Sequence, residues 1–271
     1  MKRQHLESSE SDRGAKRKSI PQGLKPASLA ARIGTAERRA LPKANPPDRN
    51  PPKLIGAKAA DRKAIRENGY GVDSFTPKEL RKLRGMKDPY GIQKFLDDAT
   101  YHLADTAWSP RRVLAEQTAH CLEGAIFAAA ALRANGYPPL LLDFEAENDT
   151  DHVIAIFKQH GCWGAVAKSN FTGCRWREPV HRSLRELALS YFNTYFNLRR
   201  ERTLRRFSVP VNLKRFDQQN WMTTDKPVWF IVYHLFEIKH YPLITAAQAK
   251  RLHRADERLF QAECVGKAVK G

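Results

Sequence analysis

The stretch from Cys121 to Asn135 constrains the fold more than any other part of the chain, because it is apolar on nearly all sides. Its many alanines leave almost no polar face at helical spacing, which is typical of a helix surrounded by protein. Gly136 follows as a helix C-terminal cap, and Pro138-Pro139 prevents the helix from continuing. A helix of this kind belongs at the centre of a domain.

Three strand-like runs follow this helix, and the links between them are short. The runs are Leu140–Phe144, His152–Phe157 and Trp163–Ala167. A polar link joins the first two runs, and a tight turn near His160-Gly161 joins the last two. A central buried helix packed on an antiparallel β-meander predicts an α+β domain.

Further elements are expected on either side of this core. Thr76-Pro77-Lys78-Glu79 is a capping box with proline at the first helical position, and it predicts a helix to Gly85. The apolar spacing and start signals predict other helices over Tyr90–Leu103, from Ser109-Pro110, over Ser183–Phe196 and over Ala246–Phe260, and a strand over Trp229–Phe236.

The segment from Met1 to about Tyr70 differs in composition from the rest of the chain. It holds 17 Lys and Arg against 7 Asp and Glu, and seven of the 16 prolines, with very few large apolar residues. Such a segment cannot bury enough apolar surface to fold, so residues 1–70 are predicted to be a disordered tail before a domain at 71–271 whose core is at about 110–175. Of the net charge of +18, about +10 lies in this tail, which predicts nonspecific contact with polyanions or merely a solubilising role.

The four cysteines are predicted to be free thiols. They are Cys121, Cys162, Cys174 and Cys264, and no two of them form a Cys-x-x-Cys pair, so neither a zinc site nor another metal or cofactor is expected.

The first residues lack the apolar stretch of a secretory signal, and no run of about 18 apolar residues could span a bilayer. A cytoplasmic location without membrane contact is the expectation.

Cys121 is the strongest candidate for a nucleophile. It stands at the start of the predicted central helix, where unpaired backbone N–H groups and the helix dipole favour a thiolate. His152, at the start of the second strand, is the candidate base, with His120 as an alternative by adjacency. Against this, cysteine often serves as a small buried hydrophobic residue.

The residues around Cys121 and His152 resemble those of transglutaminase-like and papain-like cysteine enzymes. The similarity covers His120–Tyr137, Asp151–Phe157 and Trp163–Ala167, within roughly residues 112–175. It implies a Cys-His-Asp or Cys-His-Asn triad and acyl-enzyme chemistry on an amide, ester or thioester, as in a protease, an amidase or a transglutaminase. The peptide or other acyl substrate is left open.

The third member of the implied triad departs from the transglutaminase pattern. Such domains carry an Asp after the Trp-led strand, where this chain has Ala167-Lys168-Ser169-Asn170 and no carboxylate. If His160-Gly161 is a two-residue turn, Ser169 is in register with position 152; a three-residue loop or a bulge places Asn170 there instead. The chemistry favours Asn170, because its amide oxygen can accept a hydrogen bond from an imidazole.

Three weaker candidates complete the predicted site. Gln117 is the nearest side chain that could join the Cys121 N–H in an oxyanion hole. Trp163 and Trp176 either line a substrate cleft or belong to the core.

Two function hypotheses follow from these residues. The first is a cysteine-dependent hydrolase or acyltransferase that uses Cys121, His152 and Asn170 or Ser169. The second is a catalytically inactive binding or scaffold module of the same fold, whose basic tail contacts polyanions. Nucleic-acid binding by the folded domain ranks last, because no helix-turn-helix, zinc-finger or stacking-platform signature is present.

Overall fold

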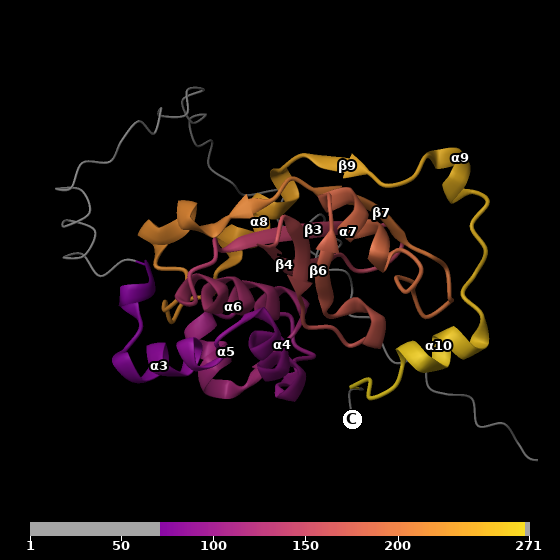
Figure 1. Ribbon diagram of the computed structural model, residues 1–271. Coiled ribbons are helices and arrows are strands. Elements are labelled where there is room, and N and C mark those ends of the chain that lie inside the picture. The colour runs from indigo at the N-terminus through magenta and orange to yellow at the C-terminus, as the bar shows by residue number, and fades with distance from the viewer. Residues whose placement is uncertain (1–70, 269–271) are drawn as a thin grey trace, which may run out of the picture.

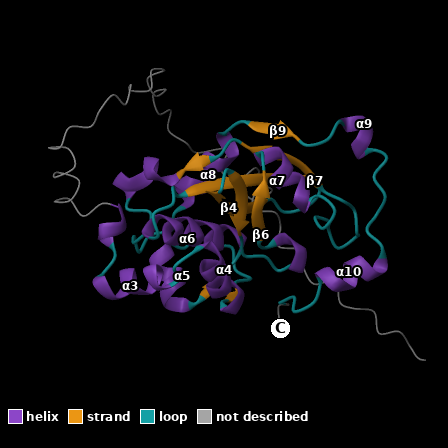
Figure 2. Cartoon of the chain, viewed as in Figure 1, coloured by secondary structure: helices purple, strands orange, loops and turns teal. Residues whose placement is uncertain are grey.

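The computed structural model describes residues 71–268, so the predicted tail at 1–70 lies outside the described residues (Figure 1). In the described chain, helices pack on both faces of a seven-stranded sheet with strand order β6-β5-β4-β3-β7-β9, and β8 pairs with β3 (Figure 2). All pairs within this sheet are antiparallel. The predicted α+β class is confirmed.

The predicted meander forms the middle of the sheet. The strands are β3 (Leu140–Ala146), β4 (His152–Gln159), β5 (Cys162–Val166), β6 (Arg177–His181), β7 (Leu204–Ser208), β8 (Val211–Asn212) and β9 (His240–Pro242). Gln159 pairs with Cys162, so the turn between β4 and β5 has two residues. His160 and Gly161 both adopt positive φ, 48° and 81°, which suits the twist of a tight hairpin.

The predicted central helix is α6 (Cys121–Ala134), and it packs on one face of this sheet. Residues 122–132 of α6 are all buried, in agreement with the apolar sequence. Around it lie α3 (Pro77–Gly85), α4 (Pro89–Asp98) and α5 (Pro110–Glu116), together with the short η1 (Gly71–Ser74). A small separate sheet pairs β1 (Thr100–Tyr101) in parallel with β2 (Thr118–Ala119).

The opposite face of the sheet carries a second core under α7 (Leu184–Tyr191). Side chains alternate along β4: Val153, Ala155 and Phe157 join the core around α6, whereas Ile154 and Ile156 join the core around α7. The remaining elements are η2 (Thr172–Cys174), η3 (Leu213–Gln219), α8 (Trp229–Glu237), α9 (Ala246–Ala249) and α10 (Glu257–Glu263).

Four element predictions were wrong in type or length. The helix predicted over Ser183–Phe196 ends at Tyr191 as α7. Residues 229–237 form helix α8 instead of a strand, because Ile231, Val232 and Leu235 are buried together at helical spacing although their residue types favour strands. The predicted closing helix is divided into α9 and α10. The helix predicted to end at Leu103 ends at Asp98, since Thr100 pairs with Thr118 in the small sheet.

Candidate functional site

Cys121 is the first residue of α6, as predicted, and its side chain is partly exposed. Burial of the sulfur by neighbouring atoms raises the pKa of the thiol to about 11, although the backbone N–H groups of Leu122 and Val153 favour the thiolate. Asp143 and Glu123 raise the pKa further, because a negative charge nearby disfavours a second one. At neutral pH the group is therefore a thiol.

His152 opens β4 and lies on the face of the sheet that packs against α7. Its ring is surrounded by the rings of Phe144, Tyr191 and Tyr195, whose centroids lie 6.3–6.5 Å away. Nε2 donates a hydrogen bond to the carbonyl oxygen of Cys174 at 2.9 Å, and burial lowers the pKa of the imidazole to about 4. His152 is therefore a neutral core residue on this side, held by the hydrogen bond from Nε2.

The alternation of β4 accounts for this separation. Cys121 lies beside Val153, which faces α6, and neighbouring residues of a strand point to opposite faces of a sheet. In the described chain, no hydrogen bond or ion pair joins the Cys121 thiol to the His152 imidazole. Moving His152 to the α6 face requires a one-residue shift of the strand. A catalytic role for the pair stays a prediction.

Asp143 of β3 is the charged residue that lies beside Cys121 on the α6 face. It pairs across the sheet with Val153, and its Oδ2 lies 2.9 Å from His240 Nε2. The other ring nitrogen of His240 faces the carbonyl oxygen of Ile238 at 3.0 Å. Both ring nitrogens of His240 therefore face oxygen atoms that can accept. The hydrogen bond with Asp143 raises the pKa of His240, and burial raises the pKa of the Asp143 carboxyl. The sequence signal was Asp143 itself, a lone carboxylate inside an apolar strand.

Glu123 anchors a second polar cluster at the start of α6. Its buried carboxylate accepts hydrogen bonds from His102 Nδ1 at 3.0 Å, Thr106 Oγ1 at 2.6 Å and the Trp108 N–H at 3.0 Å. Burial alone raises the pKa of Glu123, but His120 and these donors outweigh that effect and lower it. The cluster ties the loop after β1 to the central helix.

His120, the alternative partner for Cys121, belongs to this cluster. Its Nε2 donates to the carbonyl oxygen of Thr106 at 2.8 Å, and burial lowers its pKa. The loop therefore holds the ring on the Glu123 side of α6. Among the described residues, the ring makes no hydrogen bond to the Cys121 thiol.

Lys168, Ser169 and Asn170, which follow β5, make separate contacts. Lys168 Nζ donates to the carbonyl oxygens of Leu96 and Ala99 at the end of α4. Ser169 Oγ accepts from the Phe171 N–H, and the Asn170 amide makes two hydrogen bonds with the backbone of Ala268, at 2.8 and 3.0 Å. Neither Ser169 nor Asn170 reaches the His152 ring, whose partner is the Cys174 carbonyl.

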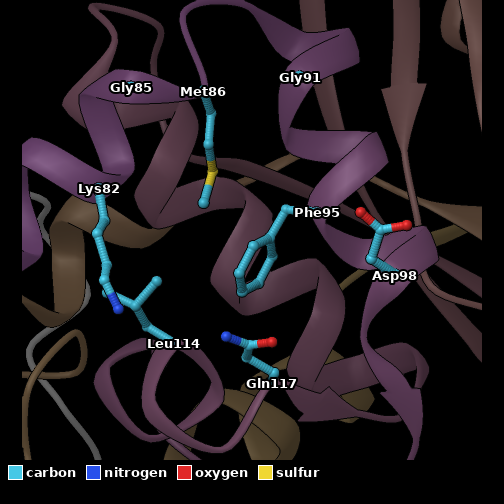
Figure 3. Close-up of a pocket in the computed structure, with 8 residues that line it drawn as sticks. All are labelled: Lys82, Gly85, Met86, Gly91, Phe95, Asp98, Leu114 and Gln117. Carbon is cyan, nitrogen blue, oxygen red and sulfur yellow. The ribbon is translucent and has the colours of Figure 1, made fainter.

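The weaker candidates also lie apart from Cys121. Gln117 ends α5 in the left-handed conformation and lines a pocket between α3, α4 and α5 (Figure 3). Trp176 stacks on Phe157 and donates from Nε1 to Glu178 at 2.8 Å, and the Trp163 ring lies under the Lys158 amine. Both tryptophans are partly buried, and their place in a substrate cleft stays a prediction.

Residues 71–268 hold no cluster of metal ligands and no helix that could cross a membrane. No group of three His, Cys, Asp or Glu side chains within that range is placed to hold a metal ion. Over the same residues, no helix is both long and apolar enough to cross a membrane.

Comparison with known proteins gives a distant similarity of structure. No protein-family model and no curated protein sequence matches the chain. Among solved structures, Legionella pneumophila LapG is similar to 38% of this chain over 70% of its own length, with 16% identity and a TM-score of 0.26. The EGTA-treated form of the same protein covers 40% of this chain and 69% of its own, with 16% identity and a TM-score of 0.27. Similarity at this level assigns neither a family nor an activity to the chain.

Proposed function

We propose that the chain is a noncatalytic binding module that contacts polyanions through its basic N-terminal segment. The observation that carries the noncatalytic part is the position of His152, which lies on the α7 side of the sheet, hydrogen-bonded to Cys174. A nucleophilic cysteine needs a base within hydrogen-bond reach. Cys121 instead has the carboxylate of Asp143 nearby, which opposes thiolate formation.

The segment after β5 supports the same interpretation, because it holds no carboxylate. Where transglutaminase-like domains carry the Asp of the triad, this chain has Ala167-Lys168-Ser169-Asn170. The polar side chains of this segment bind other groups: Lys168 the end of α4, Ser169 the Phe171 N–H, and Asn170 the backbone of Ala268.

The polyanion part of the proposal comes from the charge of residues 1–70, where 17 basic residues face 7 acidic ones. Lysine and arginine side chains replace counterions on a polyanion, so binding of this kind weakens steeply with salt. The test is binding of heparin and of oligonucleotides by the full chain and by a variant in which Lys16, Arg17 and Lys18 are changed to Gln. Binding that is equal in both proteins contradicts a docking role for this segment.

A second candidate is a thiol hydrolase or acyltransferase, favoured by the position of Cys121. Backbone N–H groups of Leu122 and Val153 are directed at its sulfur, as expected of a site that stabilises negative charge at a helix start. Turnover of an activated ester that is lost in Cys121→Ser, with the fold retained, is the result that favours this candidate over the noncatalytic one.

A further inference from the structure

Helix α3 displays a dense group of positive side chains that have no partner in the folded domain. Lys78, Arg81, Lys82 and Arg84 of α3, and Lys87 just after it, are all exposed. Within residues 71–268, none of the five makes an ion pair or a side-chain hydrogen bond. We call these five residues the α3 cations.

The acidic residue of α3 does not neutralise them. Glu79 accepts a hydrogen bond from the Thr76 N–H at 2.7 Å in the capping box, and it pairs with Arg111 at 2.9 Å. Arg111 also donates to the carbonyl oxygens of Ser74 and Thr223. The Glu79 carboxylate therefore holds the helix in place and forms no ion pair with any of the α3 cations.

The α3 cations are held in a defined arrangement. Leu83 is fully buried against the core, so the helix cannot rotate about its axis without exposing that side chain. Arg81 and Lys82 precede Leu83 and lie on the outer surface, and Lys78 lies one turn before Lys82, about 6 Å along the axis. A preformed row of this kind binds a chain of negative charges at low entropic cost.

A pocket of about 530 Å³ opens next to these side chains, between α3, α4 and α5 (Figure 3). Its apolar lining is Met86, Phe95 and Leu114, and Phe95 is supported from behind by Phe127, with ring centroids 4.7 Å apart and an angle of 26°. Lys82 and Asp98 lie on either side of Phe95 in this view. The volume is within the range of small-ligand sites.

The polar groups of this pocket suit the edge of a nucleobase. The Gln117 amide offers a donor and an acceptor, and the Asp98 carboxylate accepts hydrogen bonds from amino groups. The supported ring of Phe95 offers an apolar contact for a base plane. Phosphates on the α3 cations would place a neighbouring base at the mouth of the pocket, since Lys82 belongs to both.

We propose that the α3 cations and the adjoining pocket form a docking surface for single-stranded nucleic acid, with phosphates on α3 and an unpaired base between Met86, Phe95 and Gln117. This inference rests on the polyanion binding proposed above and adds a surface of the folded domain to it. An anionic membrane fits less well, because no large apolar side chain of α3 is exposed to insert into lipid. A duplex fits less well, because its bases are stacked inside.

The test is fluorescence anisotropy of a short labelled single-stranded oligonucleotide with the full chain over a series of salt concentrations. The variant with Lys78→Gln, Arg81→Gln and Lys82→Gln should raise the Kd about tenfold or more and reduce the slope of log K against log salt by about 2. The matched control changes three exposed lysines elsewhere, Lys214→Gln, Lys226→Gln and Lys250→Gln, and should leave both quantities nearly unchanged. Equal losses in the two triple variants overturn the proposal.

The pocket is tested separately with Gly85, which lines it. A Cβ atom on Gly85 meets nothing within 4 Å, so Gly85→Leu adds a large side chain at the lining of the pocket without a clash at the backbone. We expect weaker binding of the single strand with the same salt slope, and Gly85→Ala as a control close to wild type. Unchanged binding in Gly85→Leu overturns the base pocket.

Comparing variants separates this inference from the function on which it rests. If the Lys16, Arg17 and Lys18 variant loses binding and the α3 variant does not, the polyanion function stands and the α3 surface is wrong. If the wild-type chain binds heparin but no oligonucleotide, only the α3 surface is wrong; if it binds neither, both are wrong. Tighter binding to phosphatidylserine vesicles or to the matching duplex than to the single strand also overturns the proposal.

Discussion

Gly124 and Lys168 are in direct contact, because a Cβ atom built on Gly124 would lie 2.4 Å from the Cβ atom of Lys168. The segment after β5 therefore rests on the first turns of α6, next to Cys121. From there the Lys168 amine reaches the carbonyl oxygens of Leu96 and Ala99. A glycine in the central helix and a buried lysine together join α4, α6 and the sheet.

Gly124→Ala should destabilise the domain even though alanine favours helices. The added methyl group overlaps Lys168 near its backbone, and overpacking of this kind costs about 1–3 kcal/mol. The control is Gly85→Ala, because its new methyl group meets nothing within 4 Å. This variant should raise the free energy of unfolding by about 0.5–1 kcal/mol. Urea unfolding of both variants measures the two effects, and a stabilised Gly124→Ala protein contradicts the contact.

Lys168→Met should also destabilise the domain. It removes the amine that donates to the carbonyl oxygens of Leu96 and Ala99, so both lose this hydrogen bond at the buried end of α4. The free energy of unfolding should fall by about 1–3 kcal/mol. Hydrogen exchange should rise at the last turn of α4. Lys214→Met, at an exposed lysine, is the matched control and should change neither quantity.

His152 should make the domain sensitive to acid. Burial lowers the pKa of its imidazole to about 4, below the unfolded value, so its contribution is complete above about pH 6.5 and is lost as pH falls toward the folded pKa. Between about pH 7 and 4.5 this should remove about 2–3 kcal/mol of unfolding free energy. Urea unfolding of the wild type and of His152→Gln at both pH values measures this loss. If the imidazole is exposed, the two proteins lose the same unfolding free energy between the two pH values.

Cys121 should be a slow thiol at neutral pH. With a pKa of about 11, only about a thousandth of it is thiolate at pH 8. Iodoacetamide alkylation followed by peptide mass spectrometry should therefore be slow and unaffected by His152→Ala, with Cys162 and Cys264 as internal controls. Fast alkylation below pH 8 that is lost in His152→Ala contradicts the noncatalytic proposal and restores the hydrolase.

The pair of His240 and Asp143 should stabilise the domain more in mild acid than in base. The hydrogen bond raises the pKa of His240 above its unfolded value, so its contribution is present below about pH 6.5 and is lost as pH rises through the folded pKa. His240→Gln should lose more stability at about pH 5.5 than at about pH 8.5. A loss independent of pH, measured by urea unfolding, contradicts an ionised pair.

The local patterns of the sequence determined much of this structure. The apolar run from Cys121, the capping box at Thr76 and the turn at His160-Gly161 each appear as predicted, because caps, turns and helical periodicity depend on neighbouring residues. The α+β class followed from the order of these elements. Segment 229–237 was misread because its apolar residue types suit a strand or a buried helix, and packing decided between them.

The surroundings of Cys121 were decided by the tertiary structure. The sequence shows that Cys121 starts a helix and that His152 starts a strand. It does not show which side chains of that strand lie on the face of the sheet that packs against the helix. The register assigns Val153 and Asp143 to the α6 face and His152 to the other, and it brings His240 to Asp143 from 97 residues away. Residues far apart in sequence meet only after the sheet has formed, so no local pattern records their pairing.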